Sequence, residues 1–143
     1  MPNQQPVTII MVEDDEGHAR LIEKNIRRAG VCNEILQFAS GTGALEYLFS
    51  PEGRKNGPVL VLLDLNLPDM HGTDILARLK SDDVLKRAPV IVLTTTDDKR
   101  EIERCYDLGA NVYITKPVEY ASFSQAIRQL GLFLSVMHIP DAS

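Results

Sequence analysis

The chain has few cysteines and no long apolar run. Its two cysteines, Cys32 and Cys105, do not form a CxxC pair, which argues against a disulfide scaffold and favours a reduced protein. No apolar stretch approaches the ~18 to 20 residues that a membrane-spanning helix needs. The start of the chain also lacks the pattern of a secretory signal peptide. We therefore expect a cytoplasmic protein without a membrane segment.

The chain also has no excess of positive charge. Its 15 Lys and Arg residues against 20 Asp and Glu give a net charge of −5, which argues against a surface for nucleic acid. The nearest basic cluster has helical spacing and consists of Arg20, Lys24, Arg27 and Arg28. This spacing indicates a solvated helix face, with a partner surface as the alternative.

Length and apolar content are sufficient for one compact domain. The chain has 143 residues, of which 44% are hydrophobic, so it can bury a substantial core but is too short for two domains. We expect a loose leader at residues 1–6, a folded domain at 7–135 and a tail at 136–143.

Short apolar runs alternate with segments of helical period. The runs lie at about 7–12, 35–38, 59–63, 90–94 and 111–114, and they are typical of strands, four of which we expect to be buried on both faces. The second helix is predicted to begin after Ser40 and to stop at Ser50 and Pro51, and the last to run from about Glu119. Five βα units predict an α/β fold with one doubly wound parallel sheet.

Polar residues stand at the ends of four of these runs: Glu13, Asp14 and Asp15, then Asp64, Thr94 and Lys116. Because parallel strands end at one edge of a sheet, these side chains are expected to meet in an acidic pocket that a single cation faces. Such a pocket suits a divalent metal and a phosphoryl group.

The residue types suggest a role for each side chain in the pocket. Asp14 and Asp64 are the best direct ligands for Mg²⁺, and Glu13 reaches the ion directly or through a water. Asp15 is expected to cap the following helix or to face solvent. The alternative for this acidic run is a helix cap without any metal.

Asp64 is also the candidate nucleophile, because a metal-neutralised carboxylate can accept a phosphoryl group as an acyl phosphate. Lys116 and Thr94 are then placed to bind the phosphoryl oxygens. Taken alone, Thr94 would be an ordinary strand residue, and Thr95 and Thr96 are weaker candidates for the hydroxyl.

The ordered set of motifs closely resembles the receiver domain of two-component response regulators. The motifs are Val12 to Asp14, Asp64 to Pro68 with Gly72, Thr94, and Tyr113 to Pro117. The resemblance covers residues 7–135. It implies a flavodoxin-like fold with strand order 2-1-3-4-5.

The resemblance also implies roles for individual residues. Asp64 matches the phosphoacceptor for a sensor histidine kinase, while Glu13 and Asp14 match the acidic pair that binds Mg²⁺ with the backbone carbonyl of Asn66. Thr94 and Lys116 match the switch hydroxyl and the phosphate-binding lysine. Two further expectations are a switch role for Tyr113, whose alternative is simple packing at the sheet edge, and a cis peptide between Lys116 and Pro117.

The residues that flank the motifs, together with an inserted segment around 50–57, make the chain look most like the regulators that are paired with bacterial phytochrome kinases. Since the domain is complete near residue 135, we expect a stand-alone regulator that acts through an unknown downstream protein. His71 departs from the acidic or small residue that many receivers carry before Gly72, and we expect a solvated loop residue there. Apolar residues around more than one face of the last helix and tail predict a homodimer interface, with a tail folded back on its own domain as the alternative.

Two other functions stay open. One is a Mg²⁺-dependent phosphohydrolase with an aspartyl nucleophile, of the haloacid dehalogenase type. That class needs a second acid two residues after the nucleophile, where this chain has Asn66, and it usually carries a cap domain. The other is a docking module that ignores phosphate.

Overall fold

Five parallel strands form the centre of the protein, seen in a computed structural model that describes residues 6–55, 57–95, 98–116, 121–122 and 125. They are β1 (Thr8–Val12), β2 (Ile35–Phe38), β3 (Val59–Asp64), β4 (Val90–Thr94) and β5 (Val112–Thr115). The strand order is β2-β1-β3-β4-β5, and every neighbouring pair is parallel. The predicted flavodoxin-like sheet is therefore confirmed.

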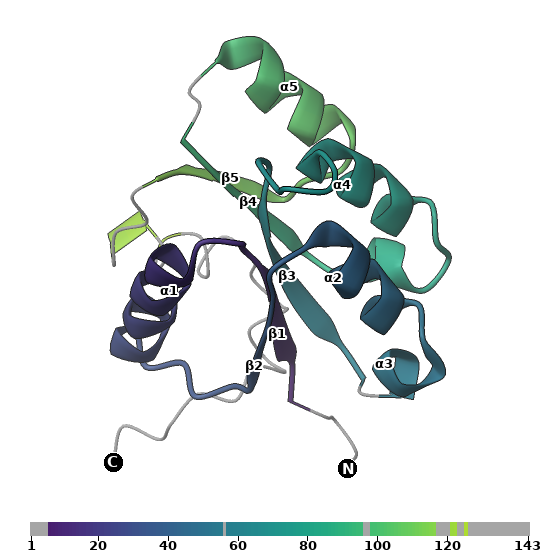
Figure 1. The fold of residues 1–143 in the computed structure, drawn as a ribbon, viewed down its shortest axis with the longest axis horizontal. Helices are drawn as coiled ribbons and strands as arrows, with labels where there is room; N and C mark the ends of the chain where they lie inside the picture. Colours follow the sequence, from purple (N-terminus) through teal and green to yellow (C-terminus); the bar gives the residue numbers. More distant parts are fainter. Residues whose placement is uncertain (1–5, 56, 96–97, 117–120, 123–124, 126–143) are drawn as a thin grey trace.

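Helices cover both faces of this sheet (Figure 1). Within the described residues they are α1 (Glu16–Arg28), α2 (Gly41–Leu48), α3 (Pro51–Lys55), α4 (Gly72–Lys80) and α5 (Lys99–Asp107), with a 3₁₀ turn at Leu85–Arg87. Alternate residues of each buried strand point to opposite faces. Ile9 and Met11 of β1 pack with α1, while Ile10 and Val12 pack with α2 and α4. This two-sided burial explains why the strands read as unbroken apolar runs.

Local sequence sets the helix starts. Asp15 is the N-cap of α1 and accepts the backbone N–H of His18 at 3.0 Å, as expected. Ser40 caps α2 in the same way through the N–H of Gly43. These side chains satisfy backbone donors that have no partner inside the helix.

Several local expectations need correction. β1, β3 and β4 are buried along their whole length, but β5 alternates between buried and exposed residues, so three strands rather than four are fully buried. The second helix ends before Ser50, yet Pro51 starts the short helix α3, because proline fits the first turn and the Ser50 hydroxyl accepts the N–H of Gly53.

The basic face of α1 also differs at one residue. Arg27 is not simply solvated, since its Nη1 donates to the carbonyls of Val31 at 3.1 Å and Asn33 at 2.7 Å. The amide of Asn33 in turn donates to the carbonyl of Val7 at 2.7 Å. Arg27 therefore joins the end of α1 to the loop that leads into β2.

Some expectations fall outside the described residues. The peptide bond to Pro117, the last helix beyond isolated positions, and the tail at 136–143 lie there, as do residues 1–5 of the leader. In the part of the chain that is described, no helix is long and apolar enough to cross a bilayer.

Candidate functional site

The site lies at the carboxyl edge of the sheet, where the strand register brings distant residues together. Val12 pairs with Leu63, so Glu13 follows β1 beside Asp64, the last residue of β3. Thr94 ends β4, and its carbonyl accepts the backbone N–H of Lys116 at 2.7 Å. The polar strand ends expected from the sequence therefore share one edge.

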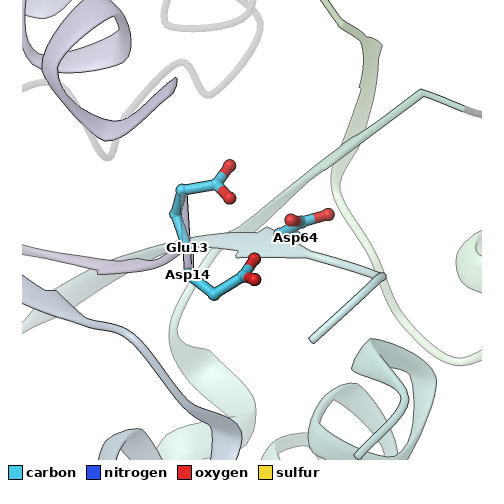
Figure 2. Close-up of side chains that lie close together, drawn as sticks. All are labelled: Glu13, Asp14 and Asp64. Atoms are coloured by element: carbon cyan, nitrogen blue, oxygen red, sulfur yellow. The ribbon is translucent and has the colours of Figure 1, made fainter. Parts of the chain in front are cut away.

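Three carboxylates meet there, as Figure 2 shows. Glu13, Asp14 and Asp64 each present an oxygen, and these oxygens all lie within 4.8 Å of one another. Glu13 and Asp64 are buried, whereas Asp14 is exposed. Clustered carboxylate oxygens at an accessible edge are the donors that Mg²⁺ prefers. The described residues thus fit a hard divalent cation at this position.

Lys116 provides the positive charge of the site. Its Nζ lies 2.5 Å from Oε1 of Glu13 and 3.2 Å from Oδ2 of Asp64. The ammonium is largely shielded, with 9% of its side chain exposed. Against three carboxylates, one lysine leaves about two negative charges, which matches the charge of a divalent ion.

Burial and charge act in opposite directions on this pair. Burial raises the pKa of Glu13, against the lowering effect of its hydrogen bond from Lys116. Burial alone would lower the pKa of Lys116, but the hydrogen bond to Glu13 and the attraction of Asp64 raise it above its ordinary value. Lys116 therefore stays protonated at neutral pH.

Backbone donors hold the carboxylates in place. The N–H of Asp15 donates to Oε2 of Glu13 at 3.2 Å, and the N–H of Asn66 donates to Oδ1 of Asp64 at 3.1 Å. The carboxylate of Asp64 is thus engaged on both oxygens, by Asn66 and by Lys116. The use of the Asn66 carbonyl as a metal ligand stays a prediction.

The two candidate switch residues lie on adjacent strands. Thr94 is fully buried at the end of β4. Tyr113 is half-buried on β5, where it pairs with Val92 and lines a cavity of about 360 Å³ together with Tyr106 of α5. Their proposed roles stay predictions, but both residues stand on the side of the sheet that faces α5.

One connection near the site was not predicted from the sequence. Asp69, in the loop between β3 and α4, accepts the backbone N–H groups of Gly41 and Thr42 and the hydroxyl of Thr42. These bonds lower the pKa of Asp69 to about 2. The partners are 27 or 28 positions away, so no local pattern could reveal that this loop is tied to the start of α2.

His71 also differs from its expected role. It does not simply lie in a solvated loop, because its ring caps α4 by accepting the N–H of Thr73. The ring is half-exposed, and its Nε2 faces Oε1 of Glu101 on α5 at 3.7 Å.

Together, a flavodoxin-like sheet and an acidic pocket with one lysine at its carboxyl edge define a class of α/β domains whose site suits a divalent cation. The comparison with family models narrows the class. Residues 9–128 match the model described as response regulator receiver domain. The chain belongs to that family.

Individual relatives show which response regulators this chain is similar to. Response regulator Rcp1 from Synechocystis is 35% identical over 96% of this chain and 95% of its own length. A response regulator receiver domain from Rhodospirillum rubrum is 64% identical, with a TM-score of 0.74 over 94% of this chain and 97% of its own. The bacteriophytochrome response regulator RtBRR is 33% identical, with a TM-score of 0.82 over 96% and 86%. The chain is thus related to phytochrome response regulators.

One related structure bears on the metal. Rcp1 has been solved in a form described as Mn(2+)-bound, and that structure is 31% identical with a TM-score of 0.73, covering 95% of this chain and 100% of its own. A divalent ion in a relative agrees with the carboxylate cluster found here.

Proposed function

We propose that this protein is a response regulator that accepts a phosphoryl group from a sensor histidine kinase onto Asp64. The observation that carries the proposal is the contact of Lys116 with both Glu13 and Asp64, in a pocket that also holds Asp14. A buried aspartate paired with a lysine beside two further carboxylates has little structural use. It is well suited to a cation and an incoming phosphoryl group.

The transfer itself is a displacement at phosphorus. An oxygen of Asp64 attacks the phosphorus of the kinase phosphohistidine, the bond from phosphorus to the imidazole nitrogen breaks with its electron pair going to that nitrogen, and an acyl phosphate forms on Asp64. When bound, Mg²⁺ would neutralise negative charge between the carboxylates and the phosphoryl oxygens. Lys116 then exchanges part of its contact with the carboxylates for phosphoryl oxygens.

The new group adds roughly −1.5 to −2 charges at the sheet edge. In this proposal the Thr94 hydroxyl donates a hydrogen bond to that charge, and Tyr113 on the next strand follows the movement of Thr94. The result is a shift between two arrangements of α5 and β5. We propose that the signal is a change in the protein-binding surface, and that a downstream protein reads this change in the cytoplasm.

The partner assignments are proposals of the same kind. The likeness to bacteriophytochrome response regulators supports a phytochrome as the kinase. We also propose a homodimer through the last helix and the tail. Sedimentation at tens of micromolar should give a dimer with or without acyl phosphate, and a monomer in both conditions would refute it.

Radiolabelled phosphotransfer tests the central proposal. A cognate kinase should label the wild-type protein in the presence of Mg²⁺ but not Asp64→Asn, while Asp74→Asn, which removes an exposed carboxylate of α4, should still be labelled. Labelling of both wild type and Asp64→Asn would show a different acceptor. Labelling of neither would favour the phosphate-independent docking module. Rapid release of phosphate from small phosphate monoesters would favour the phosphohydrolase.

A further inference from the structure

His71 connects α5 to the loop of residues 65–71, which follows Asp64 and is called the phosphoacceptor loop below. Its Nδ1 accepts the backbone N–H of Thr73 at 3.3 Å and lies 2.8 Å from the hydroxyl of the same residue. A backbone N–H can only donate, so Nδ1 must be the unprotonated nitrogen that accepts this bond. In the neutral ring the proton therefore lies on Nε2. This N–H group faces Oε1 of Glu101 at 3.7 Å.

The Glu101 oxygen that faces His71 lacks a hydrogen-bond donor among the described residues. Oε1 is buried, and among the described residues it has no hydrogen-bond partner. A buried carboxylate oxygen without a donor is costly. The Nε2–H group of His71 lies close enough that a displacement of about 1 Å or less would complete a hydrogen bond. The pair therefore attracts α5 toward the phosphoacceptor loop.

A single contact has weight here because α5 is lightly anchored. Cys105 is the one residue of α5 that is buried, whereas α1 buries three residues and α4 five. Elements with few buried contacts open and move most easily. The N-cap of α5, Asp98, comes shortly after Thr94 at the end of β4, so a movement at Thr94 reaches α5 through a short segment.

We propose that His71 and Glu101 form a latch that holds α5 against the phosphoacceptor loop while the Asp64 carboxylate is paired with Lys116. The latch must loosen for α5 to shift, so it opposes activation. This inference rests on the proposed switch function. His71 is a positioning residue here, since it acts through α5 and does not touch the phosphoryl group.

The chain offers a selective set of variants. His71→Asn keeps a side chain that can cap α4 but is too short to reach Glu101. Glu101→Gln replaces the carboxylate acceptor by a neutral amide, which weakens the bond from Nε2–H of His71 with little change in shape. Glu103→Gln removes an exposed carboxylate from the same helix and serves as the matched control. The double variant His71→Asn/Glu101→Gln tests whether the two residues act through one contact.

Two measurements read the latch. Without any ligand, hydrogen exchange of the α5 amides should be about two- to fivefold faster in either single variant, the effect of losing one partly exposed pair. Binding of beryllofluoride with Mg²⁺, followed by calorimetry, should tighten by a similar factor. The double variant should match the single variants, and Glu103→Gln should match the wild type.

Each contrary result has its own meaning. Unchanged α5 exchange in both single variants, or effects that add in the double variant, would overturn the latch. Faster exchange without tighter beryllofluoride binding would overturn its coupling to activation. A wild-type protein that binds no beryllofluoride would instead refute the proposed function, and the exchange data would still decide whether the tether exists.

Discussion

Gly72 is the position where a single methyl group should disturb the site most directly. A Cβ built there would lie 2.6 Å from Cα of Leu65 and 2.7 Å from the carbonyl oxygen of Asp64. Both are backbone atoms at the end of β3, and the N–H of Gly72 already donates to the Leu65 carbonyl at 2.9 Å. The strand end cannot move aside as a flexible side chain could. Gly72→Ala must therefore displace the backbone that carries Asp64, the proposed phosphoacceptor.

The expected cost follows from this overpacking. Forcing extra carbon into a tightly packed position typically costs about 1 to 3 kcal/mol. For a domain of this size, each kcal/mol corresponds to a fall of about 3 °C in the melting temperature. Gly72→Ala should therefore melt roughly 3 to 9 °C below the wild type. It should also accept phosphoryl groups more slowly, because Asp64 moves relative to Lys116.

Calorimetry on Gly72→Ala, with Gly17→Ala as the control, tests this reasoning. Gly17 is exposed in the first turn of α1, and its added Cβ would meet only the side chain of Asp15 at 3.2 Å. Asp15 is exposed, so its carboxylate can shift by a few tenths of an ångström, and the substitution should change the stability by less than about 1 kcal/mol. A Gly72→Ala protein that melts with the wild type and is phosphorylated at the same rate would refute the argument.

Three further outcomes are expected. Lys116→Met leaves the carboxylate of Glu13 buried without its cation, so the free energy of unfolding measured with urea at pH 7 should fall by about 3 kcal/mol. Adding Glu13→Gln to this variant should restore part of that loss. An unchanged free energy of unfolding would mean that the pair contributes nothing to stability. Mg²⁺ at a hundred times its dissociation constant should stabilise the wild type by about 2.7 kcal/mol, and equal stabilisation of Asp14→Asn in a thermal scan would place the ion elsewhere. Hydrogen bonds from Thr42 and Gly41 lower the pKa of Asp69 from 3.8 to about 2, so its stabilisation is complete above about pH 4 and is lost as pH falls through 2. The urea midpoint of Asp69→Asn should therefore fall less steeply over that range, and parallel pH profiles would contradict the assignment.

The strand ends show how far a local pattern can carry a prediction. Asp64 after five apolar residues, and Glu13 and Asp14 after another such run, are patterns within a few positions of the chain. Because parallel strands share a carboxyl edge, these patterns predict a common pocket once the strands are recognised. The contact between Lys116 and Glu13 joins residues 103 positions apart. Its partners were predictable, but its distances were not.

Other features depended on packing that no local pattern encodes. β5 lies at the edge of the sheet, and this position, not its content of apolar residues, explains why Tyr113 and Thr115 are not fully buried. Asp69 follows Pro68 in the loop after β3, and only the docking of that loop on α2 gives its carboxylate a structural role. The sequence predicts only a solvated loop residue at His71. The position of α5 brings the carboxylate of Glu101 close to its ring.

The sequence by itself determined the α/β class, the order of the elements and the chemistry available at the sheet edge. It could do so because strand burial, helix caps and turn residues are written in short stretches of chain. The tertiary structure decided which charges touch, which oxygens are already engaged, and how lightly α5 is held. Those properties depend on distances between residues far apart in the chain, which are set only when the helices pack against the sheet.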